Sequence, residues 1–145
     1  MRATRFAVGA VAAAWVCLLL SGGPAWAHHA FAAEFDANLP IRLHGTIAKV
    51  EWINPHSWIH VDVKNEAGEV DRWMIEGGNP TALLRRGFNR KSLPVGTEII
   101  VEGFRAKGNP FRANGRDLTF PDGTTLFMGS SGTGAPSDGR DPTER

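Results

Sequence analysis

The 145-residue sequence contains a single cysteine, Cys17. One cysteine excludes a disulfide within the chain and a metal site built from several cysteines. A long hydrophobic run is also missing, because the uncharged apolar stretch at residues 6–20 has about 15 residues and a membrane-spanning helix needs roughly 20. Neither Gly-x-Ser-x-Gly nor His-Glu-x-x-His occurs. The sequence therefore shows no disulfide scaffold and no signature of these catalytic classes.

The N-terminus has the three parts of a secretory signal peptide. Two arginines within the first five residues form a positive region, residues 6–20 form the apolar region, and Ser-Gly-Gly-Pro interrupts it. Alanines at positions 25 and 27 are the small residues that signal peptidase reads. We expect residues 1–27 to be removed after Ala27, which places the mature protein in the periplasm with no stable membrane insertion. An uncleaved membrane anchor is the alternative.

Cleavage after Ala27 would remove the only cysteine. Val16 precedes Cys17, whereas a lipoprotein signal needs a small residue there, so the cysteine is expected to be lost with the signal peptide. At the other end, residues 130–145 are rich in Gly, Ser, Pro, Asp and Arg, a composition typical of a disordered tail. Residues 28–129 remain as a single domain that is long enough for one hydrophobic core.

Charge is distributed unevenly along the predicted mature chain. Loss of the two N-terminal arginines from the 16 basic residues leaves 14 against 15 acidic residues, so the net charge changes from +1 to −1. Residues 28–80 hold four basic and eight acidic side chains, and residues 81–117 hold eight basic and three acidic ones. This asymmetry indicates either a face for an anionic partner or a mixed, solvated surface.

Alternation of apolar and polar residues dominates the predicted domain and indicates strands. Ile59, Val61 and Val63 alternate with polar neighbours, the pattern of a half-buried strand. In the first strand the alternation changes phase beyond Gly45, which indicates a bulge or a strong bend. Asn79-Pro80 supplies an N-cap and a first helical residue. We expect strands at residues 41–52, 58–63, 70–76, 97–105, 117–120 and 124–128, and a helix at residues 81–86.

This order of elements predicts the fold class. A mainly β chain of about 100 residues with one short helix between strands three and four fits a small, five- to six-stranded OB-like barrel, the oligonucleotide/oligosaccharide-binding architecture. A long first strand with a bend suits such a closed barrel. An open antiparallel sheet or sandwich with the helix across one end is the alternative.

Seven short stretches of the sequence carry a family resemblance. They are HHAFAAEFD at residues 28–36, GTI at 45–47, VEWINPHSWI at 50–59, EGGNP at 76–80, LRRG at 84–87, VEG at 101–103 and PDG at 121–123. These stretches resemble a family of small exported bacterial proteins that is known only as a domain of unknown function. The resemblance covers nearly all of residues 28–128 and implies a single exported domain without indicating an activity.

Histidines at the predicted mature N-terminus suggest a metal site. If cleavage follows Ala27, His28 offers both a free α-amino group and an imidazole, His29 adds a second imidazole, and His56 could supply a further ligand. Neutral nitrogen donors favour Cu(II), and to a lesser extent Ni(II) or Zn(II). The alternative is a solvated chain end that binds no metal.

The run Asn54-Pro55-His56-Ser57-Trp58 is the most unusual internal segment. In an OB-like barrel it would form the loop between strands one and two, which borders the binding face. Together with Trp52 and His60, these residues predict a ligand site made of Trp52, Asn54, His56, Trp58 and His60. A structural turn with both tryptophans in the core is the alternative.

Three functional hypotheses follow, in this order. The first is a periplasmic, non-enzymatic binding module that holds a small ligand or a protein partner at the loop 54–58 face. The second is a copper-binding protein that uses His28, His29 and His56. The third is a carboxylate-based hydrolase, for which the available acids are Glu34, Asp36, Glu51 and Glu76. Arg85, Arg86, Arg90 and Lys91, together with Phe88 and Phe104, resemble a single-strand nucleic-acid surface, but predicted export argues against nucleic acid as the partner.

Overall fold

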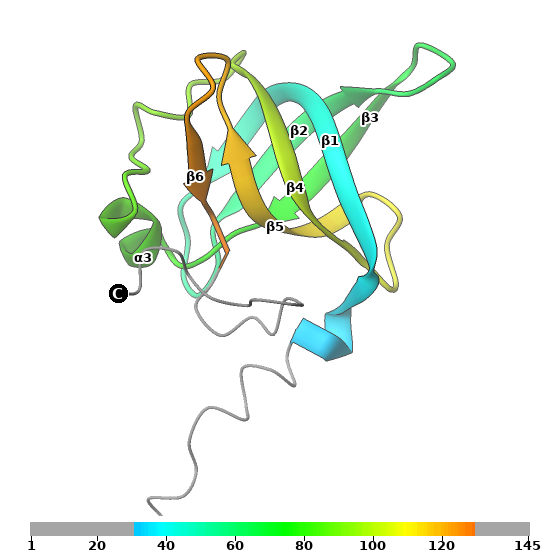
Figure 1. Cartoon of the computed structure of the whole chain (residues 1–145), viewed down its shortest axis with the longest axis horizontal. Coiled ribbons are helices and arrows are strands. Elements are labelled where there is room, and N and C mark those ends of the chain that lie inside the picture. The colour runs from blue at the N-terminus through cyan, green and yellow to red at the C-terminus, as the bar shows by residue number, and fades with distance from the viewer. Residues whose placement is uncertain (1–30, 130–145) are drawn as a thin grey trace, which may run out of the picture.

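The computed structural model describes residues 31–129, which form six strands, a short helix and a helical turn at residues 31–34 around a single main core (Figure 1). The predicted signal peptide, His28, His29 and the predicted tail lie outside the described residues. No helix within the described part is long and apolar enough to cross a membrane. The elements are β1 (Phe35–Glu51), β2 (Trp58–Lys64), β3 (Val70–Glu76), α3 (Pro80–Arg85), β4 (Glu98–Ala106), β5 (Arg112–Thr119) and β6 (Thr125–Phe127).

The strands form one sheet that closes on itself. Their order is β3-β2-β1-β4-β5-β6, and an additional parallel pairing joins β3 to β5. That pairing runs from Met74 opposite Arg112 to Glu76 opposite Asn114. It turns the first five strands into a barrel, while β6 extends β5 as a hairpin. The prediction of a mainly β, OB-like barrel with a short helix between the third and fourth strands is confirmed.

β1 pairs first with β4 and then with β2, which explains its length of 17 residues. Its first part pairs with β4 from Phe35, and its last part pairs with β2 up to Glu51. The register shifts between Ile47 and Lys49, so a bulge lies close to the predicted position. β1 needs a glycine at position 45, where it passes close to β2, because a Cβ there would lie 2.5 Å from the carbonyl oxygen of Asp62.

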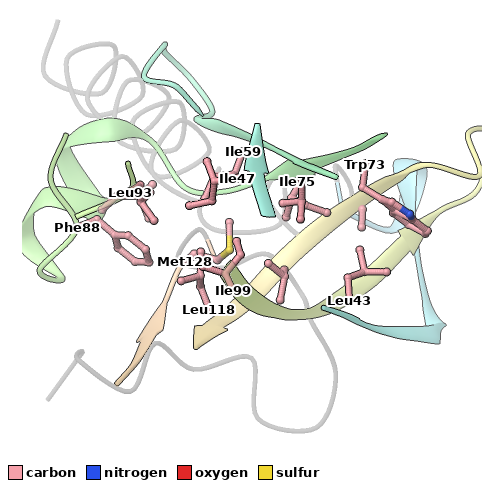
Figure 2. Close-up of a cluster of buried hydrophobic side chains, with 14 residues drawn as sticks. Leu43, Ile47, Ile59, Trp73, Ile75, Phe88, Leu93, Ile99, Leu118 and Met128 are labelled. Carbon is pink, nitrogen blue, oxygen red and sulfur yellow. The ribbon is translucent and has the colours of Figure 1, made fainter. Parts of the chain in front are cut away.

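Side chains that alternate along the strands fill the barrel (Figure 2). Ile59 and Val61 of β2 are 1% and 0% exposed, and Ile75 of β3 is fully buried. Each buried aliphatic side chain contributes about 1.5–3 kcal/mol relative to an exposed one. A smaller cluster of Phe31, Phe35, Phe104 and Ala106 closes the barrel end where the described chain begins with a helical turn at residues 31–34.

The corner between β3 and α3 follows from Asn79. Its side chain accepts a hydrogen bond from the Ala82 N–H at 2.8 Å, which satisfies one of the free donors at the helix start. Pro80 occupies the first turn, as the sequence predicts. Gly77 and Gly78 pass so close to residues 128 and 129 that an added Cβ would be crowded. The two glycines therefore form a tight corner rather than a loop that cradles phosphate.

Candidate functional site

An outward-facing layer of side chains crosses β2, β3 and β5 at one end of the barrel. Because β2 is antiparallel to β3 and β3 is parallel to β5, Trp58 lies opposite Glu76. Glu76 in turn lies opposite Asn114. In the next row, His60 lies opposite Met74, which is 36% exposed. The predicted residues Trp58 and His60 therefore share one face of β2, opposite to the buried Ile59.

Arg112 lies at the centre of this layer, where β5 begins. Its guanidinium carbon is 5.0 Å from the ring centroid of Trp58 and 5.3 Å from that of Phe35, so two aromatic rings contact one cation. Its Nη2 donates to Glu34 at 2.5 Å and to Glu76 at 3.0 Å. We call Arg112, Glu34, Glu76, Phe35 and Trp58, together with His56, the Arg112 cluster.

Two opposing effects act on the charge of Arg112. Partial burial lowers the pKa of its guanidinium, but hydrogen bonds to Glu76 and Glu34 outweigh burial, and the net pKa is raised above its ordinary value. The side chain of Glu76 is only 9% exposed, so its carboxylate depends on this partner. A buried carboxylate without a cation would be strongly unfavourable. The cluster therefore holds a permanent positive charge between two carboxylates.

His56 joins the cluster through Glu76. Its Nδ1 lies 3.3 Å from Oε1 of Glu76. The distance suits an ion pair, but Nδ1 is buried and has no hydrogen-bond partner. Because the side chain is 40% exposed, the accessible edge of the ring is the one away from Nδ1. His56 thus faces the carboxylate with one edge and the outside with the other.

Unsatisfied polar atoms concentrate at this place. Within residues 31–129, the buried side-chain nitrogens and oxygens without a hydrogen-bond partner are His56 Nδ1, Ser57 Oγ and Arg112 Nε. Buried polar groups in folded proteins are almost always paired, and exceptions gather at functional sites. All three atoms belong to the loop before β2 or to the first residue of β5. This pattern singles out the junction of these two segments.

His60 belongs to a neighbouring ion-pair chain. Its Nε2 lies 3.2 Å from Oε2 of Glu51, and Lys49 donates to Oε1 of the same carboxylate. The hydrogen bond from Lys49, followed by that from His60, lowers the pKa of Glu51 below its ordinary value of 4.5. The side chain of His60 is only 14% exposed, and it lies beside the cluster rather than within it.

The other predicted site residues have separate positions. Trp52 packs partly buried against the main core, and Asn54 is exposed in the loop, where its peptide bond to Pro55 is cis. The structure thus brings His56 and Trp58 together, sets His60 beside them, and places Trp52 in a packing role. His28 and His29 lie outside the described residues. His44, on β1, is exposed and pairs with Glu98 at 2.8 Å.

The sequence reasoning missed Arg112 and Phe35 as parts of the site. It considered Glu34 and Glu76 only as free acids for hydrolysis, and the structure shows that both bind the same Nη2 of Arg112. Asp36 instead accepts a hydrogen bond from the N–H of Asn38. Arg112 follows an aromatic residue in a basic stretch, but no sequence signal connects it with residues so far away in the chain.

The described residues contain no group of three or more His, Cys, Asp or Glu side chains that could hold a metal ion. A metal on His56 would need ligands from elsewhere. The chemistry that the cluster offers is recognition: a half-exposed indole for stacking, an imidazole edge for hydrogen bonding, and a fixed cation beside carboxylates. Groups of these kinds can orient a polar ligand.

Comparison with known proteins supplies the family. A family model described as a family of unknown function (DUF6152) matches residues 14–114, and the chain belongs to that family. The match includes most of the barrel and, at its end, the first residues of β5. No curated protein and no solved structure matches the chain.

Proposed function

We propose that the protein is an exported, periplasmic binding module without catalytic activity, which holds a small ligand or a protein partner at the loop 54–58 face. The observation that carries this proposal is the stacking of Arg112 on Trp58. Trp58 ends the β1–β2 loop and Arg112 ends the β4–β5 loop, the two loops that border the ligand face of OB-like barrels.

The contacts around this stack support a binding role. Trp58 and His56 are both half-exposed, so each can meet a ligand while its other side is held by the cluster. Glu76 and Arg112 fix these positions from behind. The three unsatisfied polar atoms in the same place fit a site shaped for recognition rather than for stability alone. Because export is predicted, the protein would bind its ligand or partner in the periplasm.

The test uses the protein as exported and purified without denaturation. Native mass spectrometry detects a bound small ligand, and a photo-crosslinking residue in place of exposed Asn54 captures a protein partner. We expect one of these signals, and we expect His56→Ala and Trp58→Ala to reduce it at least tenfold. His44→Ala is the matched control, because His44 is an exposed histidine paired with Glu98 outside the cluster.

Circular dichroism of each variant separates loss of binding from loss of folding. His56→Ala removes a 40% exposed side chain and leaves the Arg112–Glu76 pair intact, so it should remain folded. Equal ligand or partner signals in wild type and both folded cluster variants would refute the proposed site. Absence of any bound species or crosslink in wild type would refute the binding role.

A second candidate function is copper binding through His28, His29 and His56. One observation favours it: Nδ1 of His56 faces a buried carboxylate, as in metal sites where a carboxylate orients the ligating histidine. In addition, Glu34 ties the start of the described chain to Arg112.

Intact mass of the exported protein determines its first residue, and any start other than His28 removes the amino-terminal chelate. With that start established, titration with Cu(II) should give a one-to-one complex that weakens in His28→Ala, His29→Ala and His56→Ala. His44→Ala should bind as wild type does. A complex unaffected by the first three substitutions would refute copper binding at this site.

A further inference from the structure

The segment between β3 and β4, residues 77–97, differs in charge from the rest of the domain. It contains four basic residues and no acidic one. The remaining described residues contain eight basic and twelve acidic side chains. The connecting segment, which includes α3, is thus the cationic part of an otherwise acidic domain, and it lies outside the barrel wall (Figure 1). We call residues 77–97 the basic segment.

The basic segment has an anchored side and an open side. Leu83, Phe88 and Leu93 are 1%, 1% and 4% exposed and belong to the main core. Figure 2 shows Phe88 and Leu93 among the other core side chains. Leu84 and Val95, in contrast, are 54% and 70% exposed. Arg85, Arg90 and Lys91 are exposed between them along the chain. The basic segment therefore carries exposed aliphatic and exposed cationic side chains in one stretch of chain, which its three buried side chains anchor to the barrel.

The cations of the basic segment differ from those on the barrel in their partners. Arg42 pairs with Glu102, Arg72 with Asp62, and Arg112 with two glutamates. Arg85, Arg90 and Lys91 form no ion pair with any residue in the described part of the chain. No acidic side chain of the described residues pairs with these three cations, whereas most cations on the barrel form ion pairs with nearby acids.

We propose that the basic segment docks the protein peripherally on an anionic lipid surface. Arg85, Arg90 and Lys91 would bind lipid phosphates, and Leu84 and Val95 would enter the boundary between headgroups and acyl chains. An acidic protein would neutralise the cations, but exposed aliphatic side chains that flank cations, with no acid among them, match an interface that is both anionic and apolar. This proposal does not depend on the ligand site at residues 54–58.

The test measures co-sedimentation of the full exported protein with lipid vesicles. We expect binding to vesicles that contain phosphatidylglycerol, weaker binding as salt is raised, and little binding to pure phosphatidylcholine. Each basic side chain near an anionic surface contributes about fivefold to partitioning. The triple variant R85Q/R90Q/K91Q should therefore lose affinity on the order of a hundredfold.

The matched control is R42Q/K64Q/R72Q, which removes the same charge from the barrel surface and should change binding less than the basic-segment variant. The double variant L84S/V95S keeps the charge and should still weaken binding. Arg42 and Arg72 form ion pairs on the barrel, whereas Lys64, Arg85, Arg90 and Lys91 form none within the described residues. Circular dichroism checks that each variant is folded.

Three results would overturn the proposal. One is absence of binding to phosphatidylglycerol vesicles by wild type. Another is an equal loss in the basic-segment and control triple variants, which would indicate a general charge effect. The third is binding to poly-glutamate, in place of vesicles, that depends on Arg85, Arg90 and Lys91, which would indicate an acidic protein partner.

Discussion

The guanidinium carbon of Arg112 lies 5.0 Å from the centroid of the Trp58 ring. Trp58 is the first residue of β2 and Arg112 is the first residue of β5, and β3 lies between them with Glu76 as a shared neighbour. The contact therefore exists only because the parallel pairing of β3 with β5 closes the barrel. The candidate site and the closure of the fold depend on the same few residues.

We first predict that Arg112→Met destabilises the protein by about 2–3 kcal/mol. The substitution leaves the buried carboxylate of Glu76 without its cation, and breaking such a pair costs about 3–5 kcal/mol when both partners are fully buried. Arg112 is 30% exposed, which lowers the expected cost. Urea unfolding measures the change. Arg42→Met is the control, because its pair with Glu102 is exposed and should contribute at most about 0.5 kcal/mol.

The double variant R112M/E76Q extends this prediction. Neutralising Glu76 removes the uncompensated charge, so the double variant should be more stable than the sum of the two single effects implies, by about 1 kcal/mol or more. Strict additivity would show that the two side chains do not depend on each other.

Much of the fold could be predicted from the sequence because its signals are local. The predicted strand at residues 70–76 has the observed bounds of β3, with Trp73 and Ile75 buried and Met74 outward. The Asn79 cap predicted a helix at residues 81–86, and both observed ends of α3, Pro80–Arg85, lie within one residue of that range. The first strand begins at Phe35, earlier than predicted. Residues on both sides of Pro40 pair with β4, and the local alternation of apolar and polar residues does not indicate this pairing.

The candidate site was less predictable for a physical reason. His56 and Trp58 stand in one unusual run, so a local signal exists for them. Arg112 meets Glu34 and Glu76 only through tertiary pairing, across separations of 78 and 36 residues. A charge in a basic stretch does not reveal which acid it will contact. Trp52 and Trp58 look equivalent in sequence. In the structure, Trp52 packs against the main core, whereas Trp58 is the first residue of β2 and is half-exposed.

We next predict that Gly103→Ala is strongly destabilising. A Cβ at this position would lie 2.0 Å from the carbonyl oxygen of Asn114, and backbone cannot move aside as a flexible side chain can. The register of β4 and β5 also shifts at this residue. We expect a loss of about 3 kcal/mol, the upper end of the usual cost of overpacking, in thermal or urea unfolding.

Gly108→Ala is the matched control for that substitution. A Cβ at Gly108 would meet no atom within 4 Å, and the residue lies in the loop before β5. The free energy of unfolding of the Gly108→Ala variant should stay within about 0.5 kcal/mol of the wild-type value, as for other exposed positions. Equal effects of the two substitutions would contradict the close approach of β4 to Asn114.

The third prediction concerns the cap that starts α3. Asn79→Ala removes the acceptor of the Ala82 N–H and should cost about 1 kcal/mol in urea unfolding. Asn79→Asp keeps an acceptor oxygen and should retain most of the stability. If the alanine and aspartate variants were equally unstable, the side-chain cap would not be the reason that the helix begins at Pro80.

The last prediction is that acid weakens the fold through Glu51 and Asp62. Hydrogen bonds from Lys49 and His60 lower the pKa of Glu51 below 4.5, and those from Arg72 lower the pKa of Asp62 below 3.8. Since both folded values lie below the unfolded ones, the stabilisation is fully present above these ordinary values. It is lost as pH falls through the folded values, so the free energy of unfolding should decrease in acid below about pH 4.5.

The variant Asp62→Asn tests the sign of this dependence. Its free energy of unfolding should differ most from wild type at neutral pH, and the two should converge as pH falls below 3.8, because protonation then removes the Arg72 pair from wild type too. Glu66→Gln, an exposed change in the hairpin turn, is the control and should follow wild type at every pH. A difference between wild type and Asp62→Asn that is constant with pH would show that the Arg72 pair does not stabilise the ionised form of Asp62.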